Sequence, residues 1–414
     1  MNHITIPLCE LFQIGSSKRV LKSEWKDAGV PFYRGREVTR LAIDGSVNNE
    51  LFIAEEHYAE LSKCNGVPTA GDIIITAIGT IGNSYIVQPT DRFYFKDASI
   101  LWMKRNSDVL SEFVNLWLKS PLFFEQLDRG NGATVDTLTI KKLQSVRIRL
   151  PSLAEQQRIV AILDEAFEAI AVARSNAEQN RQNARALFES YLQSVFSQRG
   201  EGWVEKPLED LIESNIIGLT KNSREQGEDK TWPYVKMNNI TRENNFDLSS
   251  FTCVDATVEE VSKFSLRNGD FLFNTRNSHE LVGKSCIYES NSFDTVLYNN
   301  NIMRIRFRHD IYARFILFAF SFKDVVDQLH AMKSGTTNVS AIYFKDLKSL
   351  VIPVPPISEQ KKLSSKLAII ATETKRLESL YQRKIAALDE LKQSLLQQAF
   401  SGQLDTTRVE VLTP

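Results

Sequence analysis

An internal repeat constrains the fold of this chain more than any other feature of its sequence. The segment "PSLAEQQRIV" begins at Pro151, and "PPISEQKKLS" begins at Pro355. A shift of about 204 positions superposes Glu155 on Glu359 and stays in register without a gap, and a fixed offset of this kind indicates two copies of one structural unit. The 414 residues are therefore predicted to fold as a tandem duplication.

Each proline segment leads into a long stretch without glycine that has helical periodicity. Apolar residues recur at alternating steps of three and four, which is typical of coiled-coil helices. Stretches of roughly 45 residues predict helices about 65 Å long. We expect the two helices to pair antiparallel with each other or to bind a partner, through these residues: Val160, Leu163, Phe167 and Ile170 in the first, and Leu363, Leu367, Ile370, Leu377 and Leu391 in the second. Ser152 and Glu155 predict a capping box at the start of the first helix.

The segments that precede the two helices are also copies of each other, more diverged than the helices. "PFYRGREVTR" from Pro31 matches "PYVKMNNITR" from Pro233, and "GDIIITAIGTIG" from Gly71 matches "GDFLFNTRNSHELVG" from Gly269. Strands and helices without strict alternation predict α+β domains. The expected order is a globule over 1–150, a long helix over 151–199, a second globule over 200–354, a second long helix over 355–402, and a tail over 403–414.

The bulk composition limits the possible locations and ligands. The chain has no run of eighteen apolar residues, and "MNHITIPLCE" does not resemble a secretion signal, so we expect a cytoplasmic protein with no membrane partner. Cys9, Cys64, Cys253 and Cys286 lack paired spacing, and we expect no metal site. The net charge of −1 requires any DNA-binding surface to be a local concentration of positive charge, or to be shared with a partner.

The sequence contains only partial matches to known catalytic motifs. "SHELVGKS" ends like a phosphate-binding loop, but Ser278 stands where the first glycine of that loop belongs. His279 and Glu280 begin a metalloprotease-like motif, but Gly283 replaces its second histidine. None of the five histidines is placed for a nucleophilic triad. We therefore expect no catalytic residues and no cofactor bound by this chain.

Polar residues that suit DNA cluster at corresponding places in the two globules. Arg and Lys suit guanine, Asn suits adenine, and Thr, Tyr and glycine-rich turns suit phosphates or bases. The candidates are Tyr33, Arg34, Arg36, Thr76, Thr80, Asn83, Gly132 and Thr134 in the first globule, and Tyr234, Lys236, Asn238, Asn239, Asn274, Thr275, Arg276, Asn277, Thr336 and Thr337 in the second. A solvated loop is the alternative interpretation of each of these residues.

With these motifs in order, the whole chain resembles the specificity subunit of Type I restriction-modification enzymes. The repeated Pro-x-x-x-Glu-Gln entry into a long helix carries most of the resemblance, together with the Gly-Asp strands and the terminal "LLQQAFSGQL". The resemblance implies a non-catalytic subunit with two target recognition domains, each of which reads one half of a bipartite, asymmetric DNA sequence. It implies that the paired helices set the spacing and bind two methyltransferase subunits. It also implies S-adenosylmethionine on those subunits, and ATP and Mg²⁺ on two restriction subunits that join the complex.

Two other classes remain open from the residues alone. A DNA-modifying enzyme would need a catalytic site, and activity of the isolated chain with its cofactor would identify one. A coiled-coil scaffold with protein-binding globules would fail to bind DNA even with a partner present.

Overall fold

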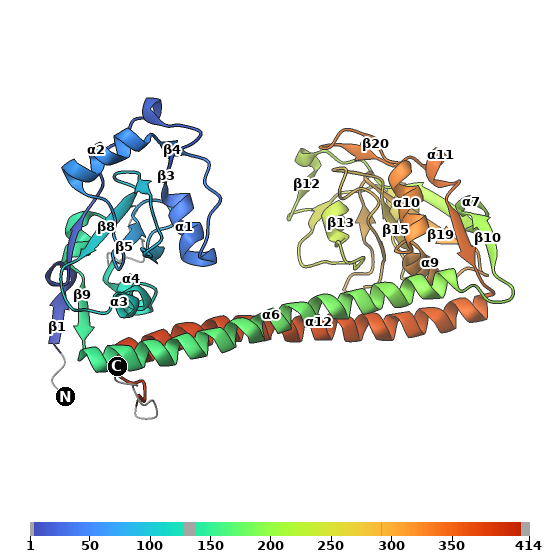
Figure 1. The fold of residues 1–414 in the computed structure, drawn as a ribbon. Helices are drawn as coiled ribbons and strands as arrows, with labels where there is room; N and C mark the ends of the chain where they lie inside the picture. The colour runs from blue at the N-terminus through green and yellow to red at the C-terminus, as the bar shows by residue number, and fades with distance from the viewer. Residues whose placement is uncertain (1–3, 128–136, 291, 407–414) are drawn as a thin grey trace. The chain divides into compact units, whose positions relative to one another are not determined.

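The computed structural model describes residues 4–127, 137–290 and 292–406, and the chain divides into two compact units (Figure 1). Unit 1 comprises Met1–Glu178 and Gln382–Pro414, and unit 2 comprises Gln179–Tyr381. The division runs through two long helices, α6 (Leu153–Ser197) and α12 (Ile357–Ser401). Each unit is therefore a mixed α/β globule joined to one half of each helix.

Unit 1 is built around an antiparallel four-stranded sheet. Its order is β2 (Phe12–Gly15), β8 (Ile100–Arg105), β5 (Ile73–Thr76) and β6 (Ser84–Ile86). A three-stranded sheet has the order β4 (Phe52–Ile53), β3 (Val30–Tyr33) and β7 (Tyr94–Phe95), and β1 (Ile4–Pro7) pairs with β9 (Arg147–Leu150). The helices are α1 (Gly35–Asp44), α2 (Glu55–Asn65), α3 (Ser111–Trp117), α4 (Pro121–Leu127) and α5 (Ile140–Ser145), with short 3₁₀ turns η1 (Leu8–Glu10) and η2 (Lys22–Glu24).

Unit 2 is built in the same way around a four-stranded sheet, and it has more additional strands than unit 1 among the described residues. Its main sheet has the order β11 (Ile212–Ile217), β19 (Ile302–Phe307), β15 (Phe271–Asn274) and β17 (Ser285–Ile287). The other strands are β12 (Gln226–Gly227), β14 (Thr252–Val254), β13 (Trp232–Val235) and β18 (Leu297–Tyr298) in one sheet, β16 (Arg276–Asn277), β21 (Ser340–Ala341) and β20 (Ser334–Gly335) in another, and the pair β10 (Val204–Pro207) and β22 (Val351–Val354). The helices are α7 (Leu208–Leu211), α8 (Val258–Phe264), α9 (Ala313–Ala319), α10 (Lys323–Ala331) and α11 (Phe344–Leu347), with 3₁₀ turns η3 (Ser223–Glu225) and η4 (Met237–Asn239).

The third strand of each main sheet is covered on both faces. All four residues of β5 are buried, and so are all four residues of β15. In unit 1, Ile73 and Ile75 contribute to the core that includes α3, whereas Ile74 packs with Trp102 in a separate core. Because successive side chains of a strand point to opposite faces, one strand supplies both cores. This explains the continuous apolar runs that follow the two Gly-Asp turns.

The two long helices pair antiparallel within each unit (Figure 1). In unit 1 the Lys392 ammonium lies 4.8 Å from the ring centroid of Phe167, and Arg174 forms a 3.2 Å ion pair with Asp389. Residue numbers therefore rise along α6 as they fall along α12. In unit 2 the second half of α6 and the first half of α12 share one core, which includes Leu192. The predictions of an α+β fold and of an antiparallel helix pair are confirmed.

The apolar residues predicted to pair the helices lie mostly in this interface. Leu163, Ile170 and Leu367 are buried. Val160, Phe167 and Leu363 are partly buried against the cores, and Ile370 and Leu377 are partly exposed. Leu391 is 46% exposed, so of the two roles expected for it partner binding stays a prediction, and Leu396 is buried instead. The helical pattern shifts by part of a turn near this end of α12, where Leu396 and Phe400 join the core of unit 1.

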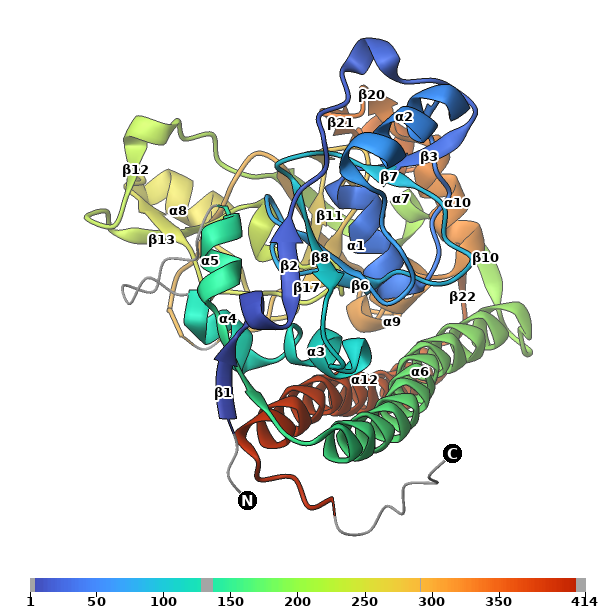
Figure 2. The same ribbon diagram turned by 60° about the vertical axis from the view of Figure 1, so that its left-hand side comes forward.

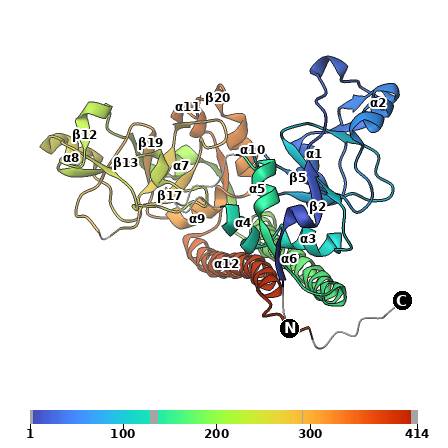
Figure 3. The same cartoon turned by 90° about the vertical axis from the view of Figure 1, so that its left-hand side faces the viewer.

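Each globule packs on the start of one long helix and on the end of the other. In unit 1, α3 lies against the pair, and the Phe113 ring contacts Phe400 of α12 with centroids 5.1 Å apart (Figure 2). In unit 2, α9 lies against the pair, and Phe315 contacts Phe196 of α6 at 5.2 Å (Figure 3). Phe196 and Phe400 are matching positions of the repeat, so the two globules use the same anchor from different helices.

The repeated glutamine at the helix entry fixes this junction. The Gln156 side chain accepts a hydrogen bond from the backbone N–H of Leu110 (3.0 Å), which caps α3, and donates to the carbonyl of Pro151 (3.0 Å). Gln360 likewise accepts from the backbone N–H of Tyr312 (2.8 Å), the cap of α9, and donates to the carbonyl of Pro355 (2.9 Å). Both glutamines are buried. The repeat therefore preserves a hydrogen-bonded corner between a long helix and a domain helix.

The predicted capping box is half formed. The Glu155 backbone N–H donates to the Ser152 hydroxyl at 3.3 Å. The Glu155 carboxylate pairs with Arg158 at 3.0 Å and accepts a hydrogen bond from the Thr406 hydroxyl at 2.6 Å.

Candidate nucleic-acid interface

Three loops meet at one edge of the main sheet in each unit. In unit 1 the Ser16 hydroxyl donates to the carbonyl of Ile100 (3.0 Å), and the Ala77 N–H donates to the carbonyl of Ser99 (2.9 Å). In unit 2 the Gly218 N–H donates to the carbonyl of Ile302 (3.0 Å). We call these places the first loop edge (residues 16–19, 77–83 and 96–99) and the second loop edge (residues 218–221, 275–278 and 299–301).

Matching backbone hydrogen bonds show that the two loop edges are equivalent. Thr275 N–H donates to the carbonyl of Asn301 (2.9 Å), as Ala77 N–H does to Ser99. A later segment donates a bond to the same residue in both units: the Ile342 N–H donates to the carbonyl of Thr275 (3.0 Å), and the Leu138 N–H donates to the carbonyl of Ala77 (2.8 Å). The loop edges therefore share one backbone scaffold, and they differ in the side chains that it carries.

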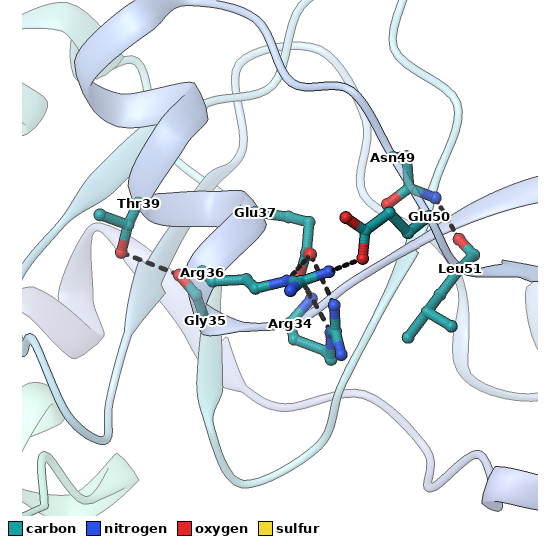
Figure 4. A network of polar contacts seen from close by, with 8 residues as sticks. All are labelled: Arg34, Gly35, Arg36, Glu37, Thr39, Asn49, Glu50 and Leu51. Atoms are coloured by element: carbon teal, nitrogen blue, oxygen red, sulfur yellow. Dashed lines mark hydrogen bonds and ion pairs between the residues drawn. The ribbon is translucent and has the colours of Figure 1, made fainter. Parts of the chain in front are cut away.

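Figure 4 shows a network of charged side chains at the start of α1. This helix adjoins the first loop edge, because Asn83 of the loop edge donates a hydrogen bond to Thr39 of α1. Arg34 caps α1, and its guanidinium donates to the buried Glu37 carboxylate at 2.9 and 3.2 Å. Arg36 bridges Glu37 and the exposed Glu50. Burial alone would raise the pKa of Glu37, but the hydrogen bonds from Arg34 and Arg36 outweigh it and lower this pKa from its ordinary value of 4.5. Glu37 thus stays ionised and holds both guanidinium groups in place.

Unit 2 has a neutral version of the same corner. The Lys236 N–H donates to the Asn239 side chain at 2.8 Å, just as the Arg34 N–H donates to Glu37 at 2.9 Å. Asn239 is buried, and its amide donates to the carbonyls of Asp247 and Ser250. Lys236 is partly exposed and corresponds to Arg34.

Four of the sequence candidates are buried side chains that hold the loops. Thr76 accepts from the Asn83 N–H and donates to the carbonyl of Thr80, and Tyr234 donates to the carbonyl of Leu219. Asn274 donates to the carbonyls of Arg276 and Asn301. The fourth is Asn239, whose hydrogen bonds are described above. Each of the four residues is at most 2% exposed. In this structure Thr76, Tyr234, Asn239 and Asn274 offer no free donor to a base, because their polar atoms are already used inside the domain.

The strand pairings agree with the sequence match between "PFYRGREVTR" and "PYVKMNNITR". The parallel pairings place Tyr33 opposite Phe95 and Val235 opposite Tyr298, so Tyr33 corresponds to Val235. The Tyr33 ring stacks on Phe93 at 4.6 Å, and burial, with Asp91 and Glu37 nearby, raises the pKa of its hydroxyl.

Thr275 is also buried, at 8% exposure, and the remaining described candidates lie at or near the surface. Asn83 donates to the Thr39 hydroxyl (3.0 Å), Asn277 donates to the Asn274 side chain (2.9 Å), and Thr336 accepts from the Val339 N–H in a tight turn. The exposed ones are Thr80, Asn238, Arg276, Thr336 and Thr337. Gly132 and Thr134 lie outside the described residues.

A hollow of about 300 Å³ opens beside the second loop edge. Thr220, Thr275, Arg276, Asn300 and Tyr343 line it. Tyr343 is 47% exposed, and the Lys345 ammonium lies 5.7 Å from its ring centroid. The hollow therefore combines a guanidinium, amide and hydroxyl groups and an aromatic face, which are the groups that contact bases and phosphates.

Sequence reasoning missed the loop that follows the first strand of each main sheet. This loop is "GSSKR" from Gly15 in unit 1 and "GLTKN" from Gly218 in unit 2. Lys18 and Arg19 are exposed there, and Thr220 lines the hollow. A side chain at Gly218 would collide with the carbonyls of Tyr298 and Asn299, so the close approach requires glycine. The repeat itself was the available signal, since both loops read Gly-x-Ser/Thr-Lys.

The described residues offer neither a cluster of metal ligands nor a helix that could span a membrane. No three His, Cys, Asp or Glu side chains of residues 4–127, 137–290 and 292–406 are grouped to hold a metal ion. Among the helices of these same segments, none combines the length and apolarity of a membrane span.

Comparison with known proteins gives one consistent family. Residues 5–179 and 200–385 match the Type I restriction modification DNA specificity domain. The chain is 24% identical over 309 residues to the EcoKI specificity subunit of Escherichia coli, covering 72% of this chain and 66% of that protein. It is 32% identical over 171 residues to a putative type I restriction enzyme specificity subunit of Haemophilus influenzae, covering 41% of each. The matches thus span from about two fifths to just under two thirds of these curated relatives.

Solved structures agree on the fold. A chain of a type I R-M system, from a study of complex assembly and conformational transition, superposes with a TM-score of 0.78 at 20% identity, covering 97% of this chain and 98% of that chain. The HsdS subunit of Thermoanaerobacter tengcongensis superposes with a TM-score of 0.61 at 19% identity, covering 97% of each. With two matched segments that together cover most of its length, the chain belongs to the Type I restriction modification DNA specificity family.

Proposed function

We propose that this chain is the non-catalytic specificity subunit of a Type I restriction-modification complex, and that it reads a split, asymmetric double-stranded DNA target. Residues 1–150 and 200–354 act as two target recognition domains, one for each half of the target. The observation that carries this proposal is the equivalence of the two loop edges, which repeat one backbone scaffold with different side chains. Two copies with different surfaces suit two half-sites of different sequence.

The long helices of segments 151–199 and 355–402 act as the spacer between the half-sites. Each is a single helix of 45 residues, which corresponds to about 67 Å at 1.5 Å per residue. A continuous helix fixes length better than a loop. The distance between the half-sites is therefore a property of the helices and not of the recognition domains.

Two methyltransferase subunits are the partners that the helix pair binds. Support comes from Leu187 and Leu391, which occupy the same position of the repeat and are 71% and 46% exposed. An exposed leucine has no packing reason to recur in both copies, and a repeated contact suits two copies of one partner. These subunits bring S-adenosylmethionine, and two restriction subunits bring ATP and Mg²⁺ where the system also cleaves.

The near-neutral charge of the chain fits a shared DNA interface. Arg34 and Arg36 are largely neutralised by Glu37 and Glu50, and Lys221 pairs with Glu260 at 3.2 Å. Partner subunits then supply much of the phosphate contact.

The test is to co-express the chain with its adenine methyltransferase subunit and to map methylated adenines in host DNA by single-molecule sequencing. We expect two short blocks separated by a gap of fixed length. A continuous motif, or no methylation by a stable complex, would contradict the proposal. The isolated chain with S-adenosylmethionine serves as the control, and methylation by it would indicate an enzyme instead.

A further inference from the structure

Arg276 and Ile78 occupy the same place in the two units. Arg276 pairs across a β-bridge with Ala341, and Ile78 pairs with Thr137. The residues that precede them, Thr275 and Ala77, make the matching backbone hydrogen bonds that define the loop edges. The scaffold therefore presents a guanidinium in one recognition domain and a branched apolar side chain in the other.

Both side chains are available for contact. Arg276 is exposed, and Ile78 is 47% exposed. Among the described residues, no acceptor receives a hydrogen bond from the Arg276 guanidinium. It differs in this respect from Arg34 and Arg36, whose donors are already directed to carboxylates.

The surroundings of Arg276 are also more polar and more aromatic than those of Ile78. Arg276 borders the hollow that Thr220, Asn300 and Tyr343 also line. Tyr343 caps α11 in unit 2, whereas the equivalent cap of α5 in unit 1 is Thr139, whose hydroxyl accepts from the Lys142 N–H at 3.2 Å. Unit 2 thus presents the aromatic ring of Tyr343 and the guanidinium of Arg276, which is unpaired among the described residues, and unit 1 presents the apolar side chain of Ile78.

The geometry points to Arg276 as the residue that selects a guanine in one half of the target, and to Ile78 as its counterpart that packs on a thymine methyl in the other half. An arginine side chain donates two hydrogen bonds to O6 and N7 of guanine, which is the commonest specific contact in the major groove. An apolar side chain distinguishes thymine by its methyl group. This inference rests on the proposed function and specifies the base chemistry of its two sites.

The experiment uses the complete complex with the methyltransferase subunit. Equilibrium binding is measured against a set of duplexes that carry the wild-type target with each base pair changed in turn. The variants are Arg276→Ile, Arg276→Lys and Ile78→Ala. Arg308→Ile is the matched control, because Arg308 is an exposed arginine that follows the opposite end of β19.

We expect Arg276→Ile to lower discrimination at a single G·C pair of one half-site by about 10-fold or more, with the other half-site unchanged. Arg276→Lys keeps the charge but loses the two-pronged geometry, so it should lose most of the same discrimination. Ile78→Ala should lower discrimination at an A·T pair of the opposite half-site. Arg308→Ile should leave every ratio unchanged.

Three results would overturn the inference. One is an unchanged pattern of discrimination in Arg276→Ile. The second is a uniform loss of affinity for all duplexes with a shallower salt dependence, which would assign Arg276 to a phosphate. The third is a change in both half-sites. Absence of any sequence preference in the wild-type complex would instead contradict the proposed function, so the two failures are distinguishable.

Discussion

Gln156 and Gln360 illustrate how one residue type, repeated in the sequence, can serve architecture instead of recognition. Each uses its amide to join the cap of a domain helix to the proline turn that begins a long helix. A buried amide with every partner in place specifies one geometry, because any other geometry leaves polar groups unpaired. The corner between globule and helix is therefore defined at the scale of one side chain.

Replacing Gln360 with alanine should destabilise unit 2. The N–H of Tyr312 and the carbonyls of Asp310 and Pro355 would lose their partner, at a cost of about 1–3 kcal/mol. Gln393→Ala, at an exposed position of the same helix, should cost less than about 0.5 kcal/mol. Denaturant unfolding measures the free energy of unfolding of both variants. Equal values for the two variants would contradict the role of Gln360.

Glu37→Gln should lower the stability of unit 1 in a pH-dependent way. The folded-state pKa of Glu37 lies below its unfolded value, so the ionised carboxylate stabilises the fold above the unfolded pKa, and this contribution is lost as pH falls through the folded-state pKa. The deficit of the variant should thus be greatest near neutral pH and should shrink below about pH 4.5. Thermal unfolding from pH 7 to pH 3.5 measures it. Glu50→Gln is the control, since Glu50 is mostly exposed, and a deficit independent of pH would exclude an ionic role for Glu37.

The sequence placed the candidates in loops at the sheet edges, but it did not separate the exposed side chains of those loops from the buried ones. Thr76 and Asn274 come last in strands that are buried on both faces, so they lie inside the domain although they precede a turn. Asn and Thr side chains form hydrogen bonds to the backbone as readily as to a ligand. The residue type alone therefore does not show which of the two partners is present. Arg276 lies only two residues after Asn274, at the start of β16, and is exposed.

At the scale of elements, the helices were the most predictable parts of the chain. Each helix of 45 residues follows a proline and a serine or proline cap, carries a stripe of apolar residues, and is followed by a glycine. All of these signals are local in the sequence. The short strands β16 and β21 pair segments more than sixty residues apart, and no local pattern specifies such a pairing. The Arg34–Glu37–Arg36 network was missed for a similar reason, because its meaning depends on the burial of Glu37.

The repeated exposed leucines predict where partners bind along the helices. Changing Leu187 and Leu391 together to glutamate should leave folding intact and should reduce methyltransferase binding by at least about 10-fold, because each removes an exposed apolar contact and introduces a charge that must be desolvated. Sedimentation of the mixed subunits gives the stoichiometry. Ile369→Glu is the matched control: Ile369 is 65% exposed, and the repeat has Glu165 at the equivalent position. Unaltered assembly of the double variant would place the partner elsewhere.

At the scale of the whole molecule, the division between the two units runs through two continuous helices and not through a linker. Inserting seven residues into each helix at the division, after Glu178 and after Tyr381, preserves the apolar pattern and lengthens each helix by about 10 Å, which is about three base pairs of DNA. We expect the gap between the half-sites to grow by about that number while both half-sites keep their sequences. Mapping methylated adenines measures this directly. An unchanged gap would exclude the helices as the spacer.

The packing of Phe400 against Phe113 also has a consequence for the order in which the protein is made. Unit 2 is one continuous segment, Gln179–Tyr381, and contains all of its own core. Unit 1 needs Leu396 and Phe400 to complete the core around α3, and these residues emerge from the ribosome nearly three hundred residues after Phe113. Unit 1 therefore begins to be synthesised first but completes its core last, and during translation its apolar surface stays uncovered until the end of α12 has been made.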